Sequence, residues 1–138
     1  MSASMPDPAA SSLSDEVCLC MPATAENVSL ARSLAAAVAV RADLPVADLE
    51  DLRLAVSEAV TGAVTDAQPG SQVRCSFVEQ AACVIVRVSY RPRLGHGPDT
   101  DGFGWAIMRA LATELTAETD QDQVILTLRI ERSVPVQA

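Results

Sequence analysis

The sequence of 138 residues has no lysine, a single histidine and few aromatic residues, which make up 3% of the chain. Arginine supplies all 10 basic side chains, while 18 acidic residues bring the formal net charge to −8. A nucleic-acid-binding surface needs basic side chains to neutralise phosphates, so this charge balance argues against nucleic acid as a partner. The absence of lysine also excludes a lysine that clamps a phosphate or forms a Schiff base.

Long hydrophobic runs are also missing. No stretch approaches the roughly 20 apolar residues that a membrane span needs, and the N-terminal residues show no signal-peptide core. We therefore expect a cytoplasmic protein that does not associate with membranes, whose cysteines stay reduced. The cysteine spacings fit no zinc pattern and His96 is the only histidine, so we expect no metal site but four buried free thiols. They are Cys18, Cys20, Cys75 and Cys83.

The composition is that of a single globular domain. Hydrophobic residues make up 49% of the chain and charged residues 20%, which is typical of a protein that buries a core. Residues 1–14 are dominated by serine, alanine and proline, and we expect a flexible tail there. The domain itself is expected at residues 15–132, with a short C-terminal tail at residues 133–138.

Hydrophobic periodicity predicts four strands and three helices. The strands are expected at 16–21, 72–78, 82–90 and 123–131, and the helices at 25–42, at about 45–67 and from residue 104 to about 115. Residues 91–102 have the composition of a loop. This order predicts an α/β (α+β) two-layer sandwich, in which the three helices cover one face of a mixed or antiparallel sheet.

The second helix contains an unusual glycine. Its buried stripe is Leu52, Val56, Ala59 and Ala63. Glu58 lies beside that stripe, and Gly62 follows one turn later, although a glycine inside a helix costs roughly 1 kcal/mol relative to alanine. Two explanations remain open: Gly62 allows another helix to approach closely, or it replaces a functional side chain. Glu58 is equally open to two interpretations, a solvated helix residue or part of a site.

Two stretches resemble one known family. "LAVSEAVTGAV" (54–64) and "GFGWAIMRALATELTAE" (102–118) are similar to the anti-sigma factor serine kinases, small members of the GHKL (Bergerat-fold) ATPase superfamily. The similarity covers roughly residues 16–131 and implies a Bergerat-like fold. Proteins of this family bind a sigma factor, phosphorylate an anti-anti-sigma protein on a serine, use Mg-ATP and form dimers.

The resemblance assigns roles to individual positions, and two nucleotide-binding positions have changed. The family pattern Ser-Glu-Ala-x-Thr-Asn-Ala places its catalytic glutamate at Glu58 and its magnesium-binding asparagine at Gly62. After the strand 82–90, the family carries Asp-x-Gly-x-Gly, whose aspartate binds the adenine amino group. Here these places hold Tyr90, Pro92 and Leu94. The ATP lid is short ("RPRLGHGPDTD"), and "DQDQ" replaces a Gly-Thr before the last strand.

Other family positions persist. Gly102 and Gly104 match the Gly-x-Gly whose amides face the phosphates, or they only start a tightly packed helix. Trp105, the only tryptophan, is either a packing anchor or a binding residue. Arg32 in "SLARSLA" matches the arginine that contacts the sigma factor and the anti-anti-sigma protein, or it is an ordinary exposed arginine.

These substitutions predict a site that holds neither ATP nor a metal. The expected protein is an anti-sigma factor, a homodimer that sequesters a sigma factor and is released by an anti-anti-sigma protein without phosphorylation. In that case Glu58, Gly102 and Gly104 are unused remnants. The alternative is an active serine kinase with Mg-ATP as cofactor. A third hypothesis is a dimeric scaffold that no longer binds a sigma factor.

Overall fold

Five antiparallel strands form one sheet in the order β1-β2-β3-β5-β4 in the computed structural model, which describes residues 15–133. The expected tail at 1–14 and residues 134–138 lie outside this range. The strands are β1 (Val17–Pro22), β2 (Gln72–Glu79), β3 (Cys83–Tyr90), β4 (Glu114–Asp120) and β5 (Gln123–Glu131). Every pair of neighbouring strands is antiparallel, so the sheet is not mixed.

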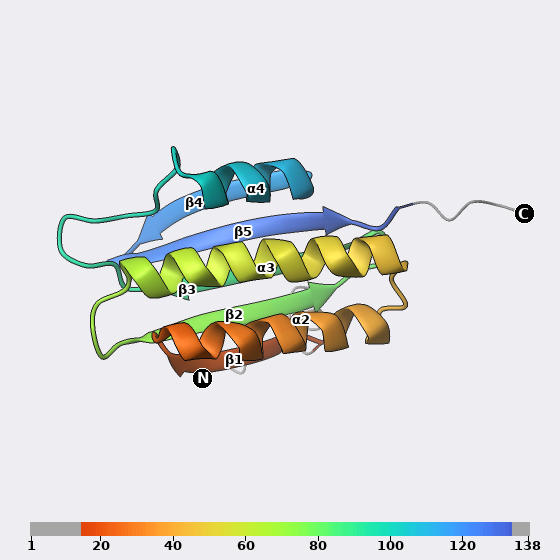
Figure 1. The fold of residues 1–138 in the computed structure, drawn as a ribbon, viewed down its shortest axis with the longest axis horizontal. Helices are drawn as coiled ribbons and strands as arrows, with labels where there is room; N and C mark the ends of the chain where they lie inside the picture. Colours follow the sequence, from red (N-terminus) through yellow and green to blue (C-terminus); the bar gives the residue numbers. More distant parts are fainter. Residues whose placement is uncertain (1–14, 134–138) are drawn as a thin grey trace, which may run out of the picture.

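The helices form the second layer, as the sequence predicts. They are the one-turn 3₁₀ helix η1 (Ala25–Asn27), α2 (Val28–Arg41), α3 (Val46–Asp66) and α4 (Phe103–Leu111). Figure 1 shows α2, α3 and α4 side by side over one face of the sheet, with α3 in the middle. The expected two-layer α+β architecture is therefore confirmed. No helix within residues 15–133 is both long enough and apolar enough to span a membrane.

The core lies between the two layers and follows the expected stripes. All four residues of the α3 stripe are fully buried: Leu52, Val56, Ala59 and Ala63. They face the alternating inward positions of the strands, which are also buried: Val73, Cys75, Phe77, Val86, Val88, Leu126 and Leu128. Burial of this apolar surface is the main stabilising contribution to such a domain.

Strand β4 is absent from the expected order of elements, and the expected third helix is too long. α4 ends at Leu111, and Ala112 already has an extended backbone. β4 follows as the edge of the sheet, where only Leu115 is partly buried. Because the other side chains of an edge strand face solvent, its sequence lacks the hydrophobic alternation that identified the remaining strands. The link to β5 is a two-residue turn in which Gln121 and Asp122 adopt positive φ angles of 50° and 68°.

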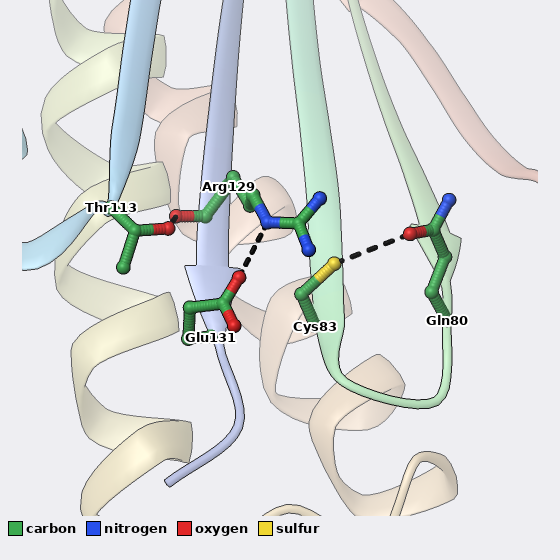
Figure 2. A network of polar contacts seen from close by, with 5 residues as sticks. All are labelled: Gln80, Cys83, Thr113, Arg129 and Glu131. Carbon is green, nitrogen blue, oxygen red and sulfur yellow. Dashed lines mark hydrogen bonds and ion pairs between the residues drawn. The ribbon is translucent and has the colours of Figure 1, made fainter.

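Polar contacts on the open face of the sheet fasten β4 to its neighbour (Figure 2). The Thr113 backbone N–H and hydroxyl donate to the Arg129 carbonyl oxygen at 2.9 and 3.2 Å. Arg129 also pairs with Glu131 on the same strand. In the β2–β3 hairpin nearby, the Cys83 thiol donates to Gln80 Oε1 at 3.4 Å. Of these contacts, those of Thr113 join the start of β4 to β5, and the others lie within β5 and within the β2–β3 hairpin.

The chain that follows β5 is fixed to the connection between α2 and α3. Arg132 donates to the carbonyl oxygens of Ala42 at 2.6 Å and Asp43 at 2.9 Å. The Ser133 backbone N–H and hydroxyl donate to the buried Asp48 carboxylate at 2.7 and 2.9 Å. Ser133, the first residue of the expected C-terminal tail, is thus attached to α3.

The expectation of four buried cysteines is half wrong. Cys75 and Cys83 are buried, whereas Cys18 and Cys20 are exposed on β1, and all four are free thiols. The reason is geometric: β1 is an edge strand, and its inward side chains are Val17, Leu19 and Met21, so the alternate positions 18 and 20 face the uncovered side. Burial raises the pKa of Cys75 to about 12, which leaves this thiol unreactive at neutral pH.

Candidate functional site

A pocket with a volume of about 530 Å³ opens between α3, α4 and the loop 91–102. α3 lines one wall with Glu58, Thr61, Gly62 and Asp66, while Gly102, Gly104 and Trp105 line another. The structure thus brings together three of the four residues singled out as site candidates, Glu58, Gly102 and Gly104. The fourth, Arg32, does not line this pocket.

Gly62 is exposed at the pocket and packs against nothing. A Cβ atom built at this position would find no atom of another residue within 4 Å beyond its own helix backbone and chain neighbours. The explanation by close helix approach is therefore wrong. The space that a side chain would take is open and faces the pocket, and no neighbouring side chain has moved into it.

Replacing Gly62 with alanine is expected to stabilise the protein by up to about 1 kcal/mol, because alanine loses less backbone entropy in a helix and has room here. Urea denaturation of both proteins measures the change. A loss of stability would show that the glycine is needed for packing after all.

Glu58 lies against the first turn of α4. A Cβ atom on Gly104 would lie only 2.8 Å from Glu58 Oε1, so any side chain at position 104 would force the carboxylate to move. Gly102 is the N-cap of α4, and a Cβ atom there would lie 2.6 Å from Asp99 Oδ2. Both glycines make room for a carboxylate, and Gly104 lets the start of α4 pack tightly against Glu58 of α3. The N-terminus of a helix favours such anions.

Tyr90 also lines the pocket, next to Asp66. It is the last residue of β3, is 2% exposed, and its hydroxyl donates to Asp66 Oδ2 at 2.6 Å. Burial, and then the hydrogen bond and charge of Asp66, raise the pKa of Tyr90 above its ordinary value of 10.0. The tyrosine therefore stays protonated and keeps its hydrogen bond to Asp66 at neutral pH.

Asp66 is the residue that the sequence analysis missed. It ends α3 and organises the loop: its carbonyl oxygen accepts the Arg93 N–H at 2.8 Å, and its carboxylate lies 4.0 Å from His96 Nδ1. Arg93 also donates from its side chain to the Ala67 carbonyl oxygen at 3.3 Å. The sequence did contain a signal for Asp66: Glu58, Gly62 and Asp66 are spaced four residues apart, and residues at this spacing share one face of a helix.

Trp105 packs as expected of an anchor, and its role in binding stays a prediction. It is partly buried and packs against the core, and it also lines the pocket.

The sequence matches the family of histidine kinase-like ATPase domains over residues 21–130. This match covers most of the chain. The protein belongs to the histidine kinase-like ATPase family. The superfamily inferred from the two sequence stretches is therefore confirmed, and the pocket lies where that resemblance places the nucleotide. No curated protein matches the sequence.

A solved structure shares the fold of this ATPase-family domain. It is the crystal structure of the RsbU and RsbW domains of Rv1364c from Mycobacterium tuberculosis, with a TM-score of 0.68 and 20% identity. The match covers 88% of this chain but 34% of the other, so the present chain spans about a third of that protein. At this identity the likeness supports the fold alone.

The lining of the pocket carries more acidic than basic side chains. Three carboxylates line it, those of Glu58, Asp66 and Asp99, against one guanidinium, Arg93, and one imidazole, His96. No group of three or more potential metal-binding side chains occurs among residues 15–133. A triphosphate that enters without its cation would meet net repulsion from this lining.

Arg32 lies on α2, away from the pocket. Its side chain is partly buried, and its Nε atom is buried without a hydrogen-bond partner in the described part of the chain. Within these residues no carboxylate forms an ion pair with its guanidinium, in contrast to Arg41, which pairs with Glu79 at 2.5 Å. The structure places Arg32 on a helix of the outer layer, and its role in partner binding stays a prediction.

Proposed function

We propose that the protein is an anti-sigma factor that sequesters an RNA polymerase sigma factor and is released by an anti-anti-sigma protein through partner switching, without ATP binding or phosphate transfer. Membership of the histidine kinase-like ATPase family and the resemblance to the anti-sigma factor serine kinases support the regulatory class. A fold shared with a protein that contains a domain named RsbW is consistent with it.

The loss of nucleotide binding is inferred chiefly from Gly62. The resemblance puts the magnesium ligand at this position, and the structure has neither a side chain there nor a neighbour that fills the space. Magnesium is held by few protein ligands besides the phosphates, so losing one removes much of its attachment. Phosphoryl transfer depends mainly on positioning and charge stabilisation, and this loss therefore affects the chemical step directly.

Tyr90 adds an independent obstacle at the adenine end. Where the resemblance expects a carboxylate that accepts the adenine amino group, the structure has a buried hydroxyl already donated to Asp66. An adenine in this place would leave its amino group without that acceptor, at a cost of about 1–3 kcal/mol. Both ends of the nucleotide would thus lose their partners.

The surface that binds the sigma factor and the anti-anti-sigma protein is expected on α2, with Arg32 as the contact residue, and the protein is expected to form a homodimer. The guanidinium has no ion pair within the described chain and has several donors for a partner carboxylate. The net charge of the protein, −8, would favour a partner with a basic surface.

A partner-exchange assay tests this function. Purified protein is expected to bind one of the sigma factors of its source organism without nucleotide and to release it when an unphosphorylated anti-anti-sigma protein is added, whether or not Mg-ATP is present. Arg32→Ala should weaken both complexes about tenfold or more if the arginine is a contact hot spot. Arg53→Ala is the matched control, since Arg53 forms only a surface ion pair with Glu50 at 3.3 Å. Failure to bind any sigma factor would favour the scaffold hypothesis.

One observation favours an active kinase as the second candidate. Glu58, the position of the family's catalytic glutamate, still lines a pocket of about 530 Å³. An active enzyme would label a serine of the anti-anti-sigma protein and would exchange its partners only in the presence of Mg-ATP. Exchange that is independent of nucleotide excludes this candidate.

A further inference from the structure

Two exposed thiols lie next to each other on the outer face of β1. Cys18 and Cys20 are two residues apart in an extended strand, so their side chains point to the same side. Their sulfur atoms are 4.0 Å apart, and both residues are exposed, on the face of the sheet that no helix covers. The two thiols lie away from the pocket and have no part in the proposed function.

The spacing of the sulfur atoms fits a bound metal ion better than a disulfide. A disulfide needs sulfur atoms about 2.05 Å apart and Cα atoms about 4.4–6.8 Å apart, and the separation of about 6.6 Å between alternate residues of a strand lies at the upper end of that range. A metal ion about 2.3 Å from each sulfur joins two sulfurs that are about 3.8 Å apart in tetrahedral geometry and about 4.6 Å apart in linear geometry. The observed 4.0 Å, at which one thiol donates a hydrogen bond to the other, lies between these limits, so that a linear two-coordinate ion requires the sulfur atoms to move apart by about 0.6 Å.

The number of ligands selects the ion. Thiolates are soft ligands that favour Cu(I), zinc and iron–sulfur clusters. Structural zinc and iron–sulfur clusters take four protein ligands, and residues 15–133 contain no group of three or more candidate ligands. Of these three, Cu(I) is the one that two thiolates can coordinate without a further protein ligand.

We propose that Cys18 and Cys20 form a two-thiolate site for a single Cu(I) ion. Binding replaces the two thiol protons with one monovalent cation, and the complex carries one net negative charge.

Arg74 on β2 supplies the charge that complements this complex. It is the cross-strand partner of Cys20, while Ser76 is the partner of Cys18. The Arg74 guanidinium lies 3.4 Å from the carboxylate of Glu16, the residue just before β1. A cation next to an anionic complex stabilises it, and Arg74 is therefore assigned as a supporting residue rather than a ligand.

Competition with a coloured Cu(I) chelator tests the site. The reduced full-length protein is titrated without oxygen against the Cu(I)–bicinchoninate complex, and we expect it to withdraw one copper ion per chain. Cys18→Ser and Cys20→Ser should each abolish the transfer, and Arg74→Gln should weaken it about tenfold. Cys83→Ser is the control, since this thiol lies outside the pair, and its copper uptake should equal that of the unchanged protein.

Three results would overturn the proposal. The first is that all copper stays with the chelator, and the second is that the double variant Cys18→Ser/Cys20→Ser still removes it. The third is that Zn(II), offered alone, binds at one ion per chain as tightly as Cu(I), which would contradict a site with only two ligands. Circular dichroism of each variant confirms that a lost transfer does not reflect unfolding.

Discussion

Replacing Tyr90 with aspartate, the residue that the resemblance expects there, should destabilise the protein by at least about 3–5 kcal/mol and should not restore nucleotide binding. The change removes a buried aromatic ring, which alone costs about 3–5 kcal/mol in a core. It also places a second carboxylate close to Asp66, whose Oδ2 now accepts the tyrosine hydroxyl at 2.6 Å. Urea denaturation measures the loss. A Tyr90→Asp protein as stable as the parent would show that the pocket has not been rebuilt around the tyrosine.

Tyr90→Phe is the matched control, because it keeps the ring and removes only the hydroxyl. It should cost about 1–3 kcal/mol, since the Asp66 carboxylate loses a donor. The pH dependence separates this role from simple packing. Because the folded pKa of Tyr90 is raised above 10.0, its contribution is complete below pH 10 and is lost as pH rises further, by about 1.4 kcal/mol per unit. The stability of Tyr90→Phe should therefore fall less steeply above pH 10 than that of the parent. An equally steep fall would contradict a stabilising role of the Tyr90 hydroxyl.

The sequence was sufficient to predict the elements that bury a clear stripe. Leu52, Val56, Ala59 and Ala63 repeat at three and four residues and are all fully buried in α3. The alternation of Val124, Leu126, Leu128 and Ile130 defines β5, whose bounds agree with those expected. In both cases one face of the element meets the core along its whole length. Edge strand β4 meets the core only at Leu115, and this is why its pattern was missed.

The candidate site was predictable in part. Glu58, Gly102 and Gly104 come together at one pocket, as their place in the family pattern implies. The open space next to Gly62 could not be predicted, because it depends on how α4 and the loop 91–102 pack against α3. The bond between Tyr90 and Asp66 joins residues 24 positions apart, and no local periodicity indicates such a contact.

The contact between Glu58 and Gly104 could not be predicted from the sequence either. Sequence spacing places Glu58 and Gly62 on one helix face, but the close approach of Glu58 to Gly104 arises from the packing of α3 against α4. The glycines of α4 therefore have a present role that does not need a nucleotide, since each leaves room for a carboxylate. This role accounts for Gly102 and Gly104 without any contact to a nucleotide.

Titration calorimetry with Mg-ATP tests most directly whether this pocket still binds a nucleotide. We expect no saturable heat up to millimolar nucleotide, which corresponds to binding weaker than about −4 kcal/mol, and no transfer of labelled phosphate to an anti-anti-sigma protein. A histidine kinase-like ATPase domain that retains the asparagine at the position of Gly62 is the positive control. Micromolar affinity of the present protein for Mg-ATP, together with labelling of a partner serine, would contradict the account.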